Sequence, residues 1–294
     1  MVMTWPALSG ALAAQLLAFA LVMAVAWLAR ARSGNSGWVD VSWTFGLGAV
    51  CAAAALWPLT PASLPERQLL VAGLVVVWAL RLGLQILQRT LSSDDDPRYA
   101  DLARQWGPRA PLYMFGLLQF QAFASLPLMA TVLVAAHRPG EALGVADWIG
   151  VALLLVAVVG EGIADRQLVA CRRSEGSQGR VCDTGLWGWS RHPNYFFQWL
   201  GWIAYALIAL DVSGAYAWGW IALLGPLSMY VLLVHVSGIP PLEAHMLRSR
   251  GDAYRAYQSR TSAFFPLPPG RVQSERKDEH GRSSHARLRD GAAS

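Results

Sequence analysis

Residues 69–88 read LLVAGLVVVWALRLGLQILQ, a largely apolar stretch in which Arg81 is the single charged side chain. A helix of about 20 apolar residues is long enough to cross the hydrocarbon core of a bilayer. Of the 294 residues in the chain, 54% are hydrophobic and 15% are charged, whereas an ordinary soluble domain has about 25% charged residues. The stretch therefore predicts a transmembrane helix, and the composition predicts that it is one of several.

Working outward from this stretch, we find further apolar segments on both sides. The seven predicted spans cover roughly residues 8–29, 38–57, 69–88, 112–136, 146–164, 194–211 and 215–236. The first has no Lys or Arg before its apolar core, and that core is too long for a signal peptide, so we expect a true span. We therefore predict an all-α membrane protein, a polytopic bundle of seven transmembrane helices.

The basic residues between these spans predict the orientation. No Lys or Arg precedes the first span, the successive connections hold two, one, four, one, five and none, and ten follow the last span. Rich and poor sides alternate, so the positive-inside rule places the N-terminus outside and the C-terminus in the cytoplasm, as in a bacterial inner membrane. We assign the net charge of +5 to contacts with anionic membrane lipids and expect no nucleic-acid partner.

The C-terminal part of the chain changes in character. Residues 240–265 mix apolar and charged side chains, which suits an amphipathic helix on the cytoplasmic face. We therefore predict one transmembrane domain over residues 1–268 and a disordered basic tail over residues 269–294. The three cysteines lack the spacing of a zinc finger, and we expect no metal site. The sequence leaves the oligomeric state open.

Charged residues inside or at the ends of the predicted spans are costly and mark candidate sites, and we single out four of them. They are Asp40, Arg81, Glu161 and Asp165. Glu161 and Asp165 are four residues apart and so share a helix face. Asp40 also suits the first turn of a helix, and Arg81 suits a structural ion pair with a neighbouring acid such as Asp40 or Glu161.

The connection between the fifth and sixth spans is the richest in polar groups. Its Arg191 and His192 stand just before Pro193, which suits the first turn of a helix, and a helix N-terminus beside two basic side chains can bind an anion. Arg172, Arg173 and Arg180 supply further guanidinium groups for phosphates. A clamp for lipid headgroups is the alternative interpretation. In the connection between the third and fourth spans, Arg98 and Tyr99 are candidate site residues, because they fall on the same predicted cytoplasmic face as the other arginines. The acids before them, Asp94, Asp95 and Asp96, suit a solvated turn.

Several of these stretches together resemble a known family. GLWGWSRHPNYF (185–196), SGIPPLE (237–243) and YRAYQSRTSAFFP (254–266) are similar to motifs of the bacterial branch of the steroid 5-alpha-reductase-like membrane proteins. Asp40 with Trp43, WALRL (78–82), DPRY (96–99) and ADRQ (164–167) fit the same branch. The resemblance covers about residues 38–268.

The resemblance implies NADPH as the cofactor and a lipophilic substrate that enters from the bilayer. In such reductases a hydride passes to the β-carbon of an enone while an acid polarises the carbonyl. On this basis we expect Asp40 to be the acid, with Arg81 beside it in the catalytic group. The residues expected to contact the cofactor are Arg98, Tyr99, Glu161, Asp165, Arg172, Arg173, Arg191, His192, Asn194, Tyr195, Gln198, Glu243, His245 and Tyr254.

The chain departs from the family pattern in two places. The steroid enzymes have a tyrosine in the third span, where this chain has Leu84, Gln85, Ile86 and Leu87. The branch usually has a glutamate where this chain has Gln198. Two alternatives therefore stay open: an S-adenosylmethionine-dependent methyltransferase of the isoprenylcysteine carboxyl type, and a membrane scaffold that kept the fold without catalysis.

Overall fold

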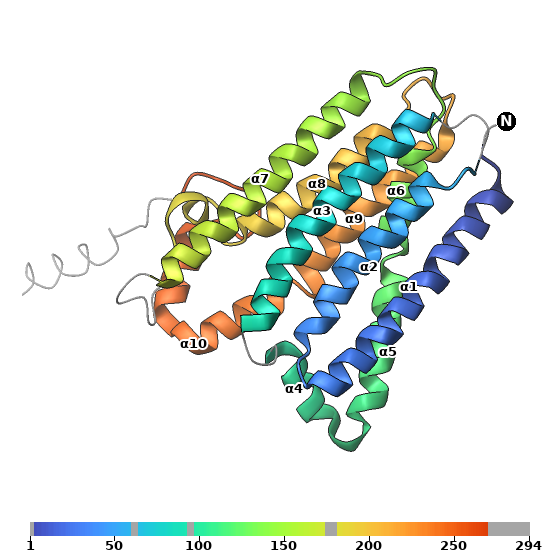
Figure 1. Ribbon diagram of the computed structural model, residues 1–294. Helices are drawn as coiled ribbons and strands as arrows, with labels where there is room; N and C mark the ends of the chain where they lie inside the picture. The colour runs from blue at the N-terminus through green and yellow to red at the C-terminus, as the bar shows by residue number, and fades with distance from the viewer. Residues whose placement is uncertain (1–2, 60–63, 93–96, 174–180, 270–294) are drawn as a thin grey trace, which may run out of the picture. The chain divides into compact units, whose positions relative to one another are not determined.

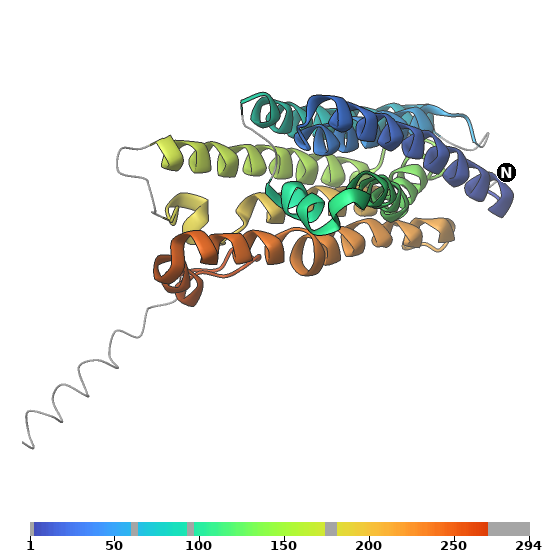
Figure 2. The same cartoon turned by 90° about the horizontal axis from the view of Figure 1, so that it is seen from below.

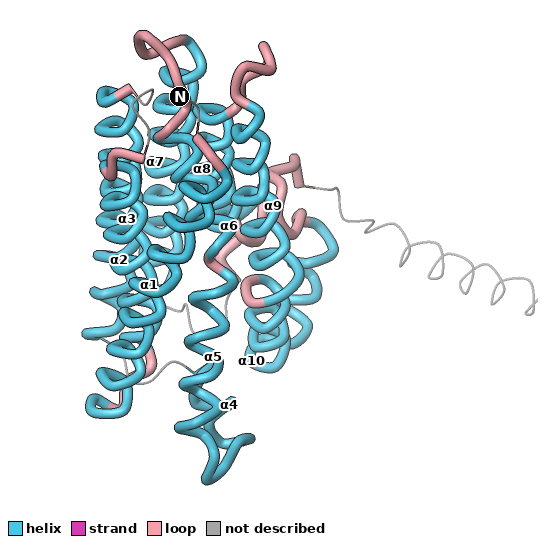
Figure 3. Tube along the Cα trace, turned by 90° about the vertical axis from the view of Figure 1, so that its right-hand side faces the viewer, coloured by secondary structure: helices cyan, strands magenta, loops and turns pink. Residues whose placement is uncertain are grey.

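The computed structural model describes residues 3–59, 64–92, 97–173 and 181–269. Figure 3 shows helices joined by loops, with no strand in that part of the chain. The chain divides into two compact units: unit 1 is Met1–Asp165 with Asn194–Leu242, and unit 2 is Arg166–Pro193 with Glu243–Ser294. The single domain predicted over residues 1–268 stays a prediction, and the predicted tail lies, apart from Pro269, outside the described residues.

The described chain is built from α-helices and short turns of other helix types. In chain order they are α1 (Trp5–Ser33), α2 (Gly37–Leu56), α3 (Pro65–Ser92), α4 (Pro97–Trp106), η1 (Gly107–Arg109), α5 (Ala110–Ala124), α6 (Leu126–Ala136), α7 (Val145–Arg173), η2 (Gly185–Gly188), α8 (Pro193–Ala209), η3 (Ala217–Leu223), α9 (Leu224–Val231), the π-helical η4 (Leu232–Val236) and α10 (Ile239–Arg260).

Six helical segments among the described residues are long and apolar enough to cross a membrane: Trp5–Ser33, Gly37–Leu56, Pro65–Ser92, Asp101–Ala136, Val145–Arg173 and Ala217–Arg260. The described part of the chain is thus all-helical, and these segments indicate an integral membrane protein. The remaining predicted span corresponds to α8, which has 17 residues and therefore a length of about 26 Å, slightly less than the hydrocarbon core of about 30 Å. The number of seven spans and their orientation stay predictions.

The helix ends follow from local sequence. Thr4 caps α1, because its Oγ1 accepts a hydrogen bond from the backbone N–H of Ala7 at 3.4 Å. The same helix ends at Gly34, whose φ of 70° is a left-handed conformation that favours glycine. The predicted fourth span forms two helices, α5 and α6, that meet at Ser125. Pro127 explains this break, since it has no N–H to continue the ladder of α5.

The helices of unit 1 pack lengthwise against one another. Figures 1 and 2 show α1, α2 and α3 side by side, and α6 contacts α2, α3 and α9. Two glycines of α7 permit a close approach to α8: a Cβ on Gly150 would lie 2.4 Å from Ile208, and one on Gly160 would lie 2.4 Å from Phe197. This approach brings the polar end of α7 close to the first turn of α8.

Unit 2 contains most of α10. The amphipathic helix predicted over residues 240–265 is confirmed as a helix over Ile239–Arg260, with a kink at Gly251, where φ is 51°. Beyond α10 the chain pairs with the turn before α8: the N–H of Arg191 donates to the carbonyl of Ser262 at 2.8 Å, and the N–H of Leu267 donates to Trp189 at 3.0 Å. These bonds hold the Arg-His-Pro turn against the end of the described chain.

Candidate functional site

An ionic cluster lies among the helices of unit 1. Arg81 of α3 forms ion pairs with Glu161 and Asp165 of α7, the first with 2.6 Å between Nη1 and Oε1. The side chains of Arg81, Glu161 and Asp165 are 14%, 7% and 10% exposed. The two acids share a helix face as their spacing predicts, and Arg81 contacts both.

Asn194 of α8 extends this cluster. Its Nδ2 donates to Asp165 Oδ1 at 3.3 Å, while its Oδ1 accepts from the backbone N–H of Tyr195 at 3.1 Å. The tight contact of Gly160 with Phe197 makes the meeting of α7 and α8 possible. The structure therefore brings together four residues that the sequence predicts for the site, from three helices: Arg81, Glu161, Asp165 and Asn194.

Gln198 lies one turn of α8 beyond Asn194. It is buried, and its Oε1 accepts a hydrogen bond from Trp78 Nε1 at 3.0 Å. Trp78 itself lies one turn before Arg81 on α3. A neutral amide at position 198 therefore satisfies the indole without a further negative charge on the helix that carries Asn194. Sequence reasoning missed Trp78 as the partner, since nothing in the spacing links α3 to α8.

A second polar group in unit 1 surrounds Asp40 in the first turn of α2. The hydroxyl of Tyr99 donates to Asp40 Oδ1 at 3.1 Å, and Arg89 Nη2 lies 3.6 Å from Asp40 Oδ2. Gln121 Nε2 donates to the Tyr99 hydroxyl oxygen at 3.3 Å. Arg81 forms its ion pairs with the two acids of α7, so the structure supports the alternative in which Arg81 holds a neighbouring acid of that helix. Tyr99, predicted as a cofactor contact, is here the partner of the predicted acid.

In unit 2, Glu243 of α10 gathers the motif residues around its carboxylate. Arg191 Nε donates to Oε1 at 2.7 Å, His192 Nε2 lies 3.0 Å from the same oxygen, and Gln258 Nε2 donates to Oε2 at 2.7 Å. Arg191 Nη1 also donates to the carbonyl of Thr261 at 2.5 Å. Much of the guanidinium predicted to bind a phosphate is thus committed to the chain's own carboxylate and backbone.

The imidazole of His192 is almost fully buried in this cluster. Burial lowers the pKa of His192 below its usual value of 6.5, and the hydrogen bond to Glu243 opposes that shift. At neutral pH the imidazole is therefore neutral, and in that form an Nε2–H donates to Glu243. The cluster contains one guanidinium cation and one carboxylate, so its formal charges cancel.

The remaining predicted site residues lie at several places in the two units. Arg172 and Arg173, at the end of α7, are exposed, and His245 is exposed on α10. Tyr254 is buried in unit 2 and joins the Glu243 cluster, because its side chain hydrogen-bonds with Glu243 and Arg191. Tyr195 is half-buried in the first turn of α8. The side chain of Arg98 lies outside the described residues, as does Arg180. Among the described residues no group of three or more His, Cys, Asp and Glu side chains could hold a metal ion.

A further charged cluster, which sequence reasoning missed, joins the first turns of α3 and α7. Arg67 and Asp147 are buried, with Arg67 Nε and Nη2 donating to the two carboxylate oxygens at 2.9 and 3.0 Å. Arg138 Nη2 donates to Asp147 Oδ2 at 3.0 Å, and Arg67 Nη2 also donates to the carbonyl of Ala142 at 3.3 Å. Arg67 is 14 residues before Arg81, about 21 Å along the helix. This cluster therefore fixes the opposite end of α3.

The fold and these clusters define the class of protein: a multi-span helical membrane protein with buried ionic and polar groups between its helices. Residues 26–261 match a family described as a protein of unknown function, DUF1295, and the chain belongs to that family. It is 25% identical over 276 residues to an uncharacterized protein of Schizosaccharomyces pombe, with 81% of this chain and 77% of that protein covered. No solved structure matches the chain.

Proposed function

We propose that the chain is an NADPH-dependent reductase of a carbon–carbon double bond in a lipophilic enone, which enters from the bilayer. We further propose seven spans, with the C-terminus in the cytoplasm of a bacterial cell and the protein in its inner membrane. The observation that carries the reductase proposal is the hydrogen bond between Tyr99 and Asp40. A phenol backed by a carboxyl group is a proton donor suited to a carbonyl oxygen.

The pair can also compensate for the tyrosine that the third span lacks. In the reaction Tyr99 donates its hydroxyl proton to the carbonyl oxygen of the enone, and Asp40, whose Oδ1 accepts from this hydroxyl before the substrate binds, positions the phenol. The resulting enol becomes the saturated ketone, and Tyr99 recovers its proton from the solvent. Gln121, whose Nε2 contacts the Tyr99 hydroxyl oxygen, orients that hydroxyl. Tyr99 is buried, which limits the access of water to its hydroxyl, whereas the side chain of Asp40 is 24% exposed.

NADPH, when bound, supplies a hydride for the β-carbon. Within unit 1 the donor and acceptor set of Glu161, Asp165 and Asn194 fits the hydroxyl and amide groups of such a cofactor. The two carboxyl groups of that cluster do not suit its phosphates. For the phosphates, the exposed Arg172 and Arg173 of unit 2 stay predictions from the sequence.

The proposal is tested by titrating purified protein with NADPH and, separately, with S-adenosylmethionine in a calorimeter. We expect NADPH to bind and Asn194→Ala to weaken it about tenfold, the equivalent of one hydrogen bond to a polar group. Asp211→Asn, beyond the opposite end of α8, is the control and should bind as the wild type does. Tight binding of S-adenosylmethionine without NADPH would instead support the methyltransferase, and binding of neither would support a scaffold.

Turnover is tested with progesterone as a steroid enone and geranylgeranial as an isoprenoid enal. Tyr99→Phe should keep NADPH affinity and lose about a hundredfold or more in the rate of NADPH oxidation, because general acids contribute at least that much. A variant that retains the full rate would remove Tyr99 from the mechanism.

A further inference from the structure

One face of α8 carries polar groups through the interior of unit 1. Asn194, Gln198, Trp202 and Tyr205 are spaced by four, four and three residues, so they share a helix face. The line spans about 16 Å at 1.5 Å per residue. We call these four residues the α8 polar face. A helix inside an apolar bundle needs no such groups for its stability, and polar groups there mark candidate sites.

The two halves of the α8 polar face differ in their hydrogen bonds. In the first half, Asn194 donates to Asp165 and Gln198 accepts from Trp78. In the second half, Trp202 Nε1 and Tyr205 Oη have no hydrogen-bond partner, although the two residues are 2% and 1% exposed. An unpaired buried donor costs about 1–3 kcal/mol, so a phenylalanine at position 205 would avoid this penalty.

Other aromatic donors of unit 1 show how unusual this pair is. Each of the following reaches an acceptor: Trp27 (Pro111, 3.0 Å), Trp43 (Ser125, 3.1 Å), Trp199 (Pro226, 3.0 Å), Tyr216 (Val134, 3.0 Å) and Trp218 (Met3, 2.9 Å). The bundle thus satisfies such groups where it encloses them. Two neighbouring exceptions on one helix face point to an acceptor that the chain itself does not provide.

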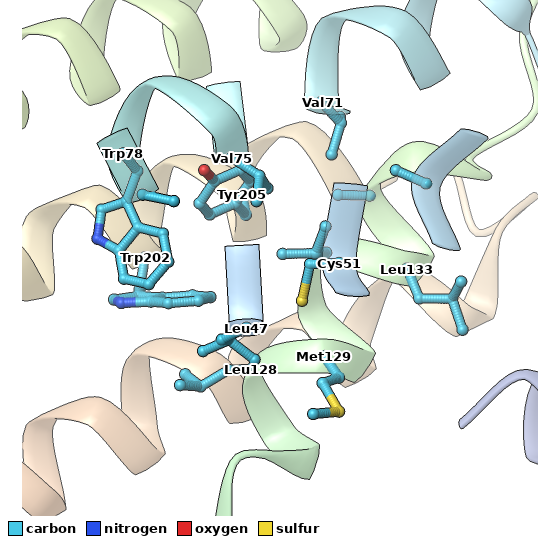
Figure 4. Packing of buried hydrophobic residues seen from close by; sticks show 14 of the residues in the cluster. Leu47, Cys51, Val71, Val75, Trp78, Leu128, Met129, Leu133, Trp202 and Tyr205 are labelled. Atoms are coloured by element: carbon cyan, nitrogen blue, oxygen red, sulfur yellow. The ribbon is translucent and has the colours of Figure 1, made fainter. Parts of the chain in front are cut away.

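The surroundings of the two donors are apolar and aromatic. Trp78 lies edge-on to Trp202, with 5.3 Å between ring centroids, and Trp202 lies 5.6 Å from Tyr205. Figure 4 shows Trp78, Trp202 and Tyr205 together above Leu47 and Leu128. A molecule that reaches these donors must therefore be lipophilic over most of its surface.

We propose that Trp202 and Tyr205 bind the carbonyl oxygen of a lipophilic ligand inside unit 1. The indole N–H can only donate, so the ligand group must be an acceptor, such as a carbonyl oxygen. The inference rests on the proposed function, because it identifies this ligand with the substrate of the reductase. In that reaction Tyr99 serves the reacting carbonyl, and the donor pair serves the second oxygen of a substrate that has two, such as progesterone.

The experiment compares a saturated ketone with its hydrocarbon, without NADPH, so that binding is separated from reduction. Methyl heptadecyl ketone and nonadecane are added to the protein in lipid nanodiscs, and tryptophan fluorescence follows their binding. Wild type should bind the ketone more tightly than nonadecane. Tyr205→Phe should lose about fivefold to tenfold in ketone affinity, the equivalent of one neutral hydrogen bond, and nothing in nonadecane affinity.

Tyr216→Phe is the matched control, because the Tyr216 hydroxyl is buried in the same unit but has a partner in Val134. Without ligand, Tyr216→Phe should unfold at a lower temperature than wild type, whereas Tyr205→Phe should unfold at the same or a higher temperature. With ketone, Tyr216→Phe should bind as wild type does.

Three results would overturn the inference: equal affinity of wild type for ketone and nonadecane, equal ketone affinity of wild type and Tyr205→Phe, or a loss of ligand-free stability in Tyr205→Phe as large as in Tyr216→Phe. The last would show that the hydroxyl already has a partner, such as an internal water. NADPH titration of Tyr205→Phe separates the two proposals, since intact cofactor binding beside a failed ketone test leaves the reductase assignment standing.

Discussion

Replacing Arg81 by methionine removes the cation that both Glu161 and Asp165 contact, with little change in side-chain length. The three side chains are nearly buried, and loss of one partner from a buried ion pair costs about 3–5 kcal/mol. One kcal/mol shifts the unfolding temperature of a chain of this size by roughly 2–4 °C. We therefore expect Arg81→Met to unfold roughly 6–20 °C below wild type, as measured by thermal unfolding in detergent.

The matched control is Arg104→Met. Arg104 forms an ion pair with Asp101 in the same unit, but the two side chains are 79% and 46% exposed, and exposed pairs contribute at most about 1 kcal/mol. A rescue variant combines Arg81→Met with Glu161→Gln and Asp165→Asn. It should recover most of the lost temperature, because the unpaired charges are then gone.

The outcome distinguishes charge from packing. If the unfolding temperature of Arg81→Met is no lower than that of Arg104→Met, Arg81 does not stabilise the two acids of α7, and our account of the cluster is wrong. If the rescue variant is less stable than Arg81→Met, the loss comes from side-chain packing and hydrogen bonds, and the charges matter little.

Two further predictions concern the other clusters. Asp147→Asn should destabilise the protein by about 3–5 kcal/mol in the same unfolding assay, because it leaves the buried Arg67 without its carboxylate; a loss below about 1 kcal/mol would show that Arg138 and the backbone satisfy the cluster without that charge. The pKa of His192 is lowered in the folded chain. At a pH between that pKa and 6.5, the imidazole is therefore protonated in the unfolded chain but not in the folded chain. The free energy of unfolding should accordingly fall as the pH drops below 6.5. His192→Gln should reduce this fall in unfolding temperature, and an unchanged pH profile would contradict it.

Much of the helical architecture could be predicted from apolar length alone. The predicted span over residues 146–164 lies within α7, but the helix continues to Arg173. The difference has a physical reason, because only the apolar part of a helix must match the bilayer, while the backbone ladder continues through polar residues. The break between α5 and α6 was missed, although Pro127 signals it.

The site could be predicted in part. Helical spacing alone places Glu161 and Asp165 on one face, and the structure agrees. Spacing does not reveal which helices are neighbours, so it left the partner of Arg81 open between two acids. The contact between Tyr99 and Asp40 joins residues 59 positions apart and depends on packing that no local pattern contains. By contrast, Trp202 and Tyr205 follow Gln198 at helical spacing, and that signal was available.

The Arg-His-Pro turn shows why charge in a sequence is an incomplete guide to ligands. Arg191 and His192 predict an anion site, and the structure does place an anion there, the carboxylate of Glu243. A phosphate that binds Arg191 must therefore displace Glu243 or share its guanidinium, and displacement would leave a half-buried carboxylate without its cation. That cost favours the exposed Arg173 over Arg191 as a phosphate contact. It also assigns Arg191 and His192 a structural role within unit 2, because their contacts with Glu243 fix the Arg-His-Pro turn.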